Sequence, residues 1–439
     1  MKIRCLLASM AAVLALSAGA ARGELQIQEW RTDSGARVLF VESRSLPMLD
    51  VAVEFAAGSS RDRPEMSGLA SLTLTMLRRG TQSLDEDRIS ERLADVGALL
   101  SPRFDVDRAG YELRTLSSKR ERRQALAVLG DILQSPSFPQ DVLEREKSRI
   151  VAALREAATR PATVADRQFR QLVFGDHPYS LPPAGEPETV ARLKRPGLVE
   201  FYRRHYNARS AVVSIIGDVS ADEARRIANQ LTGGLQRSAA AAALPPVPAL
   251  EHAVERVLAH SASQAHIRIG MPGVSRDDPD YFALWLGNQI LGGSGFTSRL
   301  TEELRQRRGL TYSAYSYFAP YARQGPFSLV AQTMKEQAPE AVAVMRNVLS
   351  EFIAAGPTAA ELDTAKRNAI GGFVLRLDSN SEILEYLCLI GFYDLPLDYV
   401  ERFPQRIAAL SGEQVREAFQ RRVDPARLVT VVVGPDQSL

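Results

Sequence analysis

An arginine and a tyrosine seven positions apart, Arg305 and Tyr312, are the residues of this sequence best suited to bind a reacting carbonyl group. Arg305 lies near the end of an expected helix, and Tyr312 follows a glycine turn at Gly309 into an expected strand, so both side chains can converge on one point. A guanidinium and a phenol can both donate hydrogen bonds to an oxyanion, an interaction worth roughly 3–4 kcal/mol per donor in acyl-transfer enzymes. A solvated surface helix and an ordinary strand explain the same residues, so both interpretations stay open.

The segment before this pair is rich in glycine. Gly292, Gly293 and Gly295 predict a loop that is free to adopt positive φ. The spacing lacks the third glycine of a dinucleotide-binding loop, and no ribose-binding acid follows about 20 residues later in a βαβ setting. The pattern therefore disfavours a dinucleotide site.

A short charged helix should follow the glycines. Phe296, Leu300 and Leu304 recur every four residues, which predicts one apolar stripe along that helix. Gly309 should end the helix, and residues 310–318 have the composition of a strand.

Other catalytic patterns are weak. None of the five histidines forms the i, i+4 pair of a helical zinc site. His260 and His266 could share a strand face but have no third ligand in view, and His177 and His205 suit turns and packing. No Gly-x-Ser-x-Gly elbow is present, and Cys388, in an apolar run, suits a buried structural role. Sequence order alone leaves a Ser–His–Asp triad open.

Residues 1–23 predict a signal peptide, so we expect an exported protein, periplasmic or secreted. Two cations precede an apolar run at 5–16, which is shorter than the ~20 residues that span a membrane. Loss of Lys2 and Arg4 takes the formal net charge from +2 to 0. A neutral mature chain gives no electrostatic case for nucleic acid, so none is expected as a partner.

The rest of the chain divides into two similar halves, which we predict as domains 24–236 and 251–439, joined by an Ala/Pro linker at 237–250. The motif at 58–64, Gly-x-Ser-Arg-Asp-x-Pro, recurs 215 positions later at 273–279. Near the end of each half, Phe-x-Arg-Arg-x-x-x-Ala-Arg occurs at 201–209 and again at 419–427. Turns, arginines and strand ends in one shared order indicate duplication.

Each half predicts an α+β domain, with a mainly antiparallel sheet and helices packed on one face. In the first half, strands are expected at 37–41, 49–56, 110–116 and 211–216. Helices are expected there at 68–79, 87–96, 119–134, 140–158, 195–205 and 221–230.

Four segments carry a family resemblance: residues 68–81, 177–182 and 292–312, with support from 206–218. On these residues the chain resembles the pitrilysin/insulinase metallopeptidases, in the two-domain branch that includes the mitochondrial processing peptidase. The resemblance covers nearly all of the mature chain. It implies a clamshell of two such chains around a chamber for extended peptides.

The zinc motif of that family is degenerate here. Active members carry His-x-x-Glu-His where this chain has Ser71-Leu-Thr-Leu74-Thr75, so hydroxyls replace both imidazoles and Leu74 replaces the general base. A neutral hydroxyl is a poor zinc ligand. The third ligand of the family should fall near 151–156, where Glu156 would have no companions. We therefore expect no metal on this chain.

The resemblance implies a divided active site. A homologous partner with an intact motif would supply zinc and the base, and this chain would supply Arg305 and Tyr312 to stabilise the transition state. Gly292, Gly293 and Gly295 would contact the peptide substrate, although turn chemistry also explains them. The alternatives are a catalytically silent structural or peptide-binding protein, and a hydrolase with a new nucleophile.

Overall fold

A computed structural model describes residues 25–238 and 242–434. The expected signal peptide lies outside the described residues, as do positions 239–241 of the expected linker. The boundaries of the two domains therefore stay a prediction.

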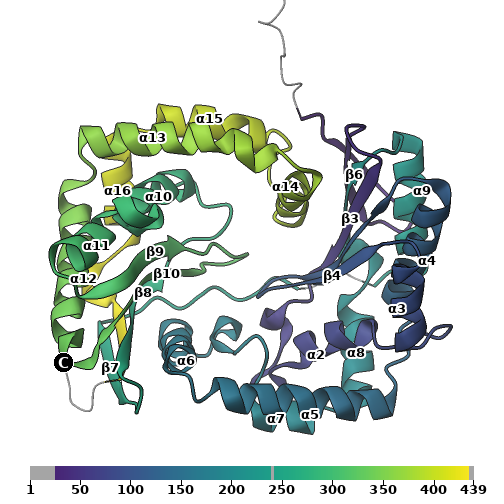
Figure 1. Cartoon of the computed structure of the whole chain (residues 1–439), viewed down its shortest axis with the longest axis horizontal. Helices are drawn as coiled ribbons and strands as arrows, with labels where there is room; N and C mark the ends of the chain where they lie inside the picture. The colour runs from purple at the N-terminus through teal and green to yellow at the C-terminus, as the bar shows by residue number, and fades with distance from the viewer. Residues whose placement is uncertain (1–24, 239–241, 435–439) are drawn as a thin grey trace, which may run out of the picture.

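Two sheets organise the chain, one in each half (Figure 1). The first sheet contains β1 (Gln28–Arg31), β2 (Arg37–Glu42), β3 (Met48–Phe55), β4 (Leu99–Phe104), β5 (Ala109–Leu116) and β6 (Val212–Gly217). The second contains β7 (Val254–Ala259), β8 (Gln264–Pro272), β9 (Thr311–Phe318), β10 (Pro326–Met334) and β11 (Val429–Gly434).

The two sheets share one topology. The order β2-β6-β3-β5-β4 in the first sheet matches β7-β11-β8-β10-β9 in the second, and β1 adds an edge strand to the first. In each sheet one pair is parallel, β2 with β6 and β7 with β11, and the other pairs are antiparallel. This agreement of strand order and direction confirms the predicted fold class of two homologous α+β units with mainly antiparallel sheets.

Helices make up most of the remaining chain. Those of the first half are α2 (Leu69–Leu77), α3 (Glu86–Ala94), α4 (Lys119–Gln134), α5 (Gln140–Ala157), α6 (Pro161–Phe174), α7 (Pro187–Arg192), α8 (Arg195–His205) and α9 (Ala221–Thr232). Those of the second half are α10 (Tyr281–Asn288), α11 (Arg299–Thr301), α12 (Ala338–Ala355), α13 (Ala359–Phe373), α14 (Asn380–Phe392), α15 (Tyr399–Ala409) and α16 (Gly412–Arg422). Every helix and strand expected in the first half is found, whereas the strands β1 and β4 and the helices α6 and α7 were not expected.

Helices of the first half cover one face of the first sheet, as predicted. The opposite face is covered by α14, a helix of the second half. Along β2, Val38 and Phe40 pack into the core formed with α2, α4, α8 and α9. Leu39 and Val41 point the opposite way and pack with α14. The strand is therefore buried on both faces, and α14 lies beside β3 and β6 in Figure 1.

The second sheet receives a helix in return. Val431 and Val433 of β11 pack with Phe169 and Val173 of α6, which comes from the first half (Figure 1). One helix of each half thus packs on the sheet of the other half. This exchange buries apolar surface from both halves together, so it fixes their relative position.

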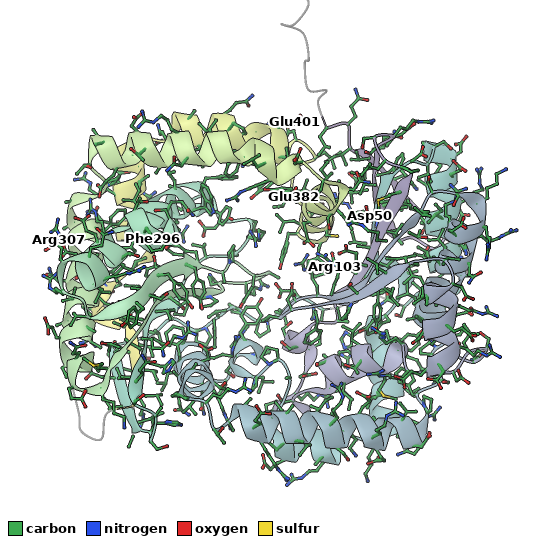
Figure 2. All side chains as sticks on the ribbon, viewed as in Figure 1. Asp50, Arg103, Phe296, Arg307, Glu382 and Glu401 are labelled. Carbon is green, nitrogen blue, oxygen red and sulfur yellow. The ribbon has the colours of Figure 1, made fainter. Side chains whose placement is uncertain are left out.

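Polar contacts reinforce this exchange. Buried Asp107 accepts hydrogen bonds from the hydroxyls of Tyr179 and Tyr393 and from the backbone N–H of Ala322, at 2.9, 2.9 and 2.7 Å. Arg103 of β4 (Figure 2) donates from Nη2 to Oε2 of Glu385 in α14 at 2.7 Å. The first half is therefore tied to the second by both apolar and polar contacts.

Candidate functional site

The helix α2 carries the positions of the degenerate zinc motif. Leu74 is buried in the first core, and its carbonyl oxygen accepts a hydrogen bond from the hydroxyl of Tyr111 at 2.6 Å. Oγ1 of Thr75 donates to the carbonyl oxygen of Ser71 at 3.0 Å, one turn earlier in the same helix. These residues do not fit a zinc ion, because one is an aliphatic core residue and the Thr75 hydroxyl is engaged with the helix backbone.

No other metal centre takes its place among residues 25–238 and 242–434, where no group of three His, Cys, Asp or Glu side chains is arranged to hold an ion. Glu156, the remaining carboxylate at the expected third-ligand position, is exposed and pairs with Arg160 at 2.5 Å. His260 hydrogen bonds through Nε2 to the carbonyl oxygen of Thr159 at 3.0 Å.

The other expectations for histidine and cysteine are confirmed. His177 is buried; its Nδ1 accepts from the N–H of Tyr179, and its Nε2 bonds to the carbonyl oxygen of Pro245. Cys388 is fully buried in the cluster around α14, and burial raises the pKa of its thiol well above the usual value. Neither residue is placed to act as a nucleophile or base.

The segment before Tyr312 is not one helix. It consists of a π-helical segment η5 (Gln289–Gly293), a 3-10 turn η6 (Gly295–Thr297), the short α11 and a second π-helical segment η7 (Glu302–Arg307). Ser298 caps α11 by accepting from the N–H of Thr301, so the regular turns begin only after it. Leu300 and Leu304 are buried, as the predicted stripe requires, but Phe296 is 68% exposed. Phe296 lies in the preceding turn, out of phase with the helix.

The glycines also differ from the prediction. Only Gly295 has a positive φ, +61°, and the space where a side chain would stand is open. Gly292 is buried in η5, where a Cβ atom would overlap with Oγ and N of Ser316 in β9. A Cβ at Gly293 would be 2.8 Å from Nδ2 of Asn288. Close packing therefore accounts for Gly292 and Gly293, and the expected free loop is reduced to the turn at Gly295.

Arg305 and Tyr312 lie on adjacent elements and are both open to solvent. The N–H of Gly309, at φ +64°, donates to the carbonyl oxygen of Arg305, and the N–H of Leu310 donates to that of Leu304. These two bonds hold the end of η7 against the start of β9. Tyr312 is 86% exposed, and Arg305 is exposed as well.

Arg305 differs from the arginines beside it. Arg307 (Figure 2) and Arg308 form ion pairs with Glu302 and Glu303, whereas no carboxylate of the described residues pairs with Arg305. Its guanidinium instead lies over the ring of Phe296, with Cζ 4.8 Å from the ring centroid. The segment therefore presents one guanidinium and one phenol that have no charged partner within the described part of the chain.

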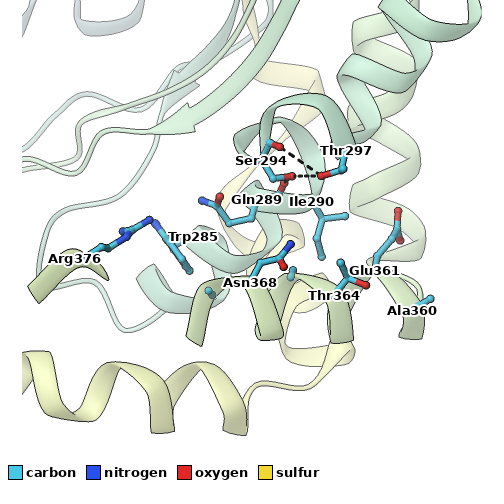
Figure 3. A pocket seen from close by; sticks show the side chains of 12 residues that line it. Trp285, Gln289, Ile290, Ser294, Thr297, Ala360, Glu361, Thr364, Asn368 and Arg376 are labelled. Carbon is cyan, nitrogen blue, oxygen red and sulfur yellow. Dashed lines mark hydrogen bonds between the residues drawn. The ribbon is translucent and has the colours of Figure 1, made fainter. Parts of the chain in front are cut away.

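A pocket of about 340 Å³, which sequence patterns did not reveal, lies between η5 and α13 (Figure 3). Its lining residues are Trp285, Gln289, Ile290, Ser294, Thr297, Ala360, Glu361, Thr364, Ala365, Asn368, Ala369 and Arg376. Ser294 and Thr297 stand on either side of Gly295 and Phe296 in the sequence. The turn that carries Phe296 therefore forms part of the pocket lining.

Comparison with known proteins decides the family. Residues 37–185 match the model described as insulinase (peptidase family M16), and residues 192–369 match the peptidase M16 inactive domain. A crystal structure of a peptidase M16 inactive domain from Pseudomonas fluorescens is 35% identical, with a TM-score of 0.91 over 94% of this chain and 99% of that one. The chain belongs to peptidase family M16.

Two relatives of the M16 family carry contrasting names. A protein of Helicobacter pylori named non-peptidase homolog YmxG is 26% identical over 399 residues, which cover 90% of this chain and 91% of that protein. An uncharacterized zinc protease of Streptomyces coelicolor is 27% identical over 390 residues, covering 86% of this chain and 83% of that protein. This M16 chain is thus a homologue of inactive-domain proteins, and its described helices include none long and apolar enough to cross a bilayer.

Proposed function

We propose that this chain is the non-zinc subunit of a heterodimeric zinc endopeptidase, with a homologous His-x-x-Glu-His chain as its partner. The proposal rests on two observations: Arg305 and Tyr312 are exposed in the second half, and the motif helix α2 of the first half has lost its zinc ligands. Arg305 has no ion pair in the described residues, and Tyr312 is 86% exposed. Both donors are therefore available to a second chain.

The two residues have one chemical role in this proposal. The Arg305 guanidinium and the Tyr312 hydroxyl donate hydrogen bonds to the carbonyl oxygen of the scissile peptide as negative charge develops on it. The partner's zinc would supply the Lewis acid and the activated water. Zinc and the general base both come from the partner in this proposal, so this chain alone is inert.

The substrate in this proposal is an extended or unfolded peptide, held between the two subunits after export. The exposed turn at Gly295 and Phe296 provides a surface for such a chain. The alternative is a catalytically silent structural or peptide-binding member of the family. It is favoured by the name of the Helicobacter relative and by the packing role of Gly292.

Three samples test the proposal: this chain, a co-expressed homologue with an intact motif, and a mixture of the two. Peptide hydrolysis and zinc content are measured for each. We expect activity only in the mixture, with zinc confined to the homologue. A mixture no more active than the homologue alone would overturn the divided site and favour the silent alternative.

A further inference from the structure

The pocket between η5 and α13 has walls of three kinds. Trp285 and Ile290 form an apolar surface (Figure 3). Ala365 and Ala369 of α13 also line the pocket and add to its apolar area. The side-chain amides of Gln289 and Asn368 line the same space, and neither bonds to another residue of the described chain. Such amides can each donate and accept, as a peptide group requires.

One end of the pocket carries an unneutralised positive charge. Arg376 lies beside Trp285 in Figure 3, with Cζ 5.8 Å from the ring centroid. It lies near the hydroxyl of Tyr386, and no carboxylate within residues 25–238 and 242–434 forms an ion pair with it. A guanidinium held against an aromatic face keeps donors free for a carboxylate.

The opposite end does not offset this charge. Glu361 receives two hydrogen bonds from Arg299, from Nε and Nη2, both at 2.7 Å. It also accepts from the N–H and hydroxyl of Thr358 at 2.7 and 2.8 Å. Because Glu361 is already neutralised and saturated, the free charge in the pocket is that of Arg376.

We propose that this pocket binds the C-terminal residue of a short peptide. The terminal carboxylate pairs with Arg376, an apolar side chain packs on Trp285 and Ile290, and the last peptide group bonds to Gln289 and Asn368. The volume of about 340 Å³ is at the small end for ligand sites, which suits one or two residues. The proposal goes beyond the divided active site, because it needs neither zinc nor a partner chain.

The chain offers its own reporter for binding. Trp30 and Trp285 are the two tryptophans, and Trp30 lies in the first half against Arg225 and Phe40. In a Trp30→Phe background, Trp285 is the sole source of tryptophan emission. The probes are acetyl-alanyl-leucine with a free carboxylate, the same peptide with a C-terminal amide, and free leucine.

We expect a saturable change of Trp285 emission with the free-acid peptide, and more than about tenfold weaker binding of the amide and of leucine. Arg376→Gln should weaken binding of the acid by the same factor and abolish its advantage over the amide. Arg367→Gln is the matched control, since Arg367 is on α13, outside the pocket lining, and pairs with Asp363. It should bind like the parent.

Several results would overturn the proposal. Equal binding of the free-acid peptide and the amide would show that the pocket does not recognise the carboxylate. Equal binding of free leucine would show that the ligand is an amino acid and not a peptide. If Arg367→Gln weakened peptide binding as much as Arg376→Gln, the effect would come from the net charge of the protein and not from a contact with Arg376. No saturable response from a chain with unchanged circular dichroism and unfolding midpoint would exclude the site. None of these readouts involves hydrolysis, so they are independent of the proposed protease subunit.

Discussion

Arg305 lies over the ring of Phe296, with Cζ 4.8 Å from the ring centroid, while its neighbours Arg307 and Arg308 are held by carboxylates. An aromatic face attracts a guanidinium without satisfying its hydrogen-bond donors. Arg305 is thus partly positioned and yet keeps its donors for another molecule. This contact with Phe296 distinguishes Arg305 from Arg307 and Arg308, which form ion pairs.

Substitution of Arg305 should therefore affect catalysis and not assembly. In the mixture with a zinc-motif homologue, we expect Arg305→Ala to lower kcat by roughly 100-fold or more, as loss of one oxyanion donor does elsewhere. Arg307→Ala, which removes only the surface ion pairs with Glu302 and Glu303, is the control and should change kcat less than about twofold. Steady-state kinetics and size-exclusion chromatography measure the two effects. Unchanged kcat with Arg305→Ala would contradict a role in the reaction.

Tyr312 can be tested by removing a single oxygen atom. Tyr312→Phe should lower kcat by roughly tenfold to 100-fold with little change of KM, because the lost bond forms mainly in the transition state. Tyr315→Phe is a matched control on the same strand, β9, where Tyr315 is 41% exposed. A rise of KM without a fall of kcat would assign Tyr312 to ground-state binding instead.

The exchange of helices between the halves predicts a shared loss of stability. Leu384 and Leu387 of α14 are fully buried against the sheet of the first half. Leu387→Ala should lower the free energy of unfolding by about 2–5 kcal/mol, and both halves should unfold at lower urea together. Leu375→Ala, at a position 68% exposed, should change it by less than about 0.5 kcal/mol. If only the second half lost stability, the exchange would not couple the halves.

His205 predicts acid sensitivity. Burial, with Arg61 and Arg204 nearby, lowers its pKa to about 4, against about 6.5 in an unfolded chain. Between these values the unfolded chain binds a proton that the folded chain does not. The free energy of unfolding should therefore fall as the pH drops from 6.5 toward 4, by at most about 1.4 kcal/mol per unit from this residue.

Urea unfolding at pH 7 and pH 4.5 measures that dependence. His205→Gln should show a smaller fall in the free energy of unfolding than the parent. His252→Gln, at an exposed position, is the control and should retain the fall of the parent. An equal fall in His205→Gln would assign the acid sensitivity to other groups.

The sequence by itself determined the repeated α+β plan and the loss of the zinc motif. Local patterns specify these features: the structure has helices at Lys119–Gln134 and Arg195–His205, the ranges that periodicity predicts. The replacement of two imidazoles by Ser71 and Thr75 needs no coordinates to interpret, because ligand chemistry belongs to the residue itself.

Only the tertiary structure decided which helix packs on which face of each sheet. An amphipathic pattern shows that α14 has a buried side but not that its partner is the sheet of the other half. The exposure of Phe296, the packing of Gly292 against Ser316 and the pocket under Trp285 likewise depend on residues distant in the chain. Periodicity is a local property, whereas burial depends on what the folded chain brings alongside, and that is why these features required the structure.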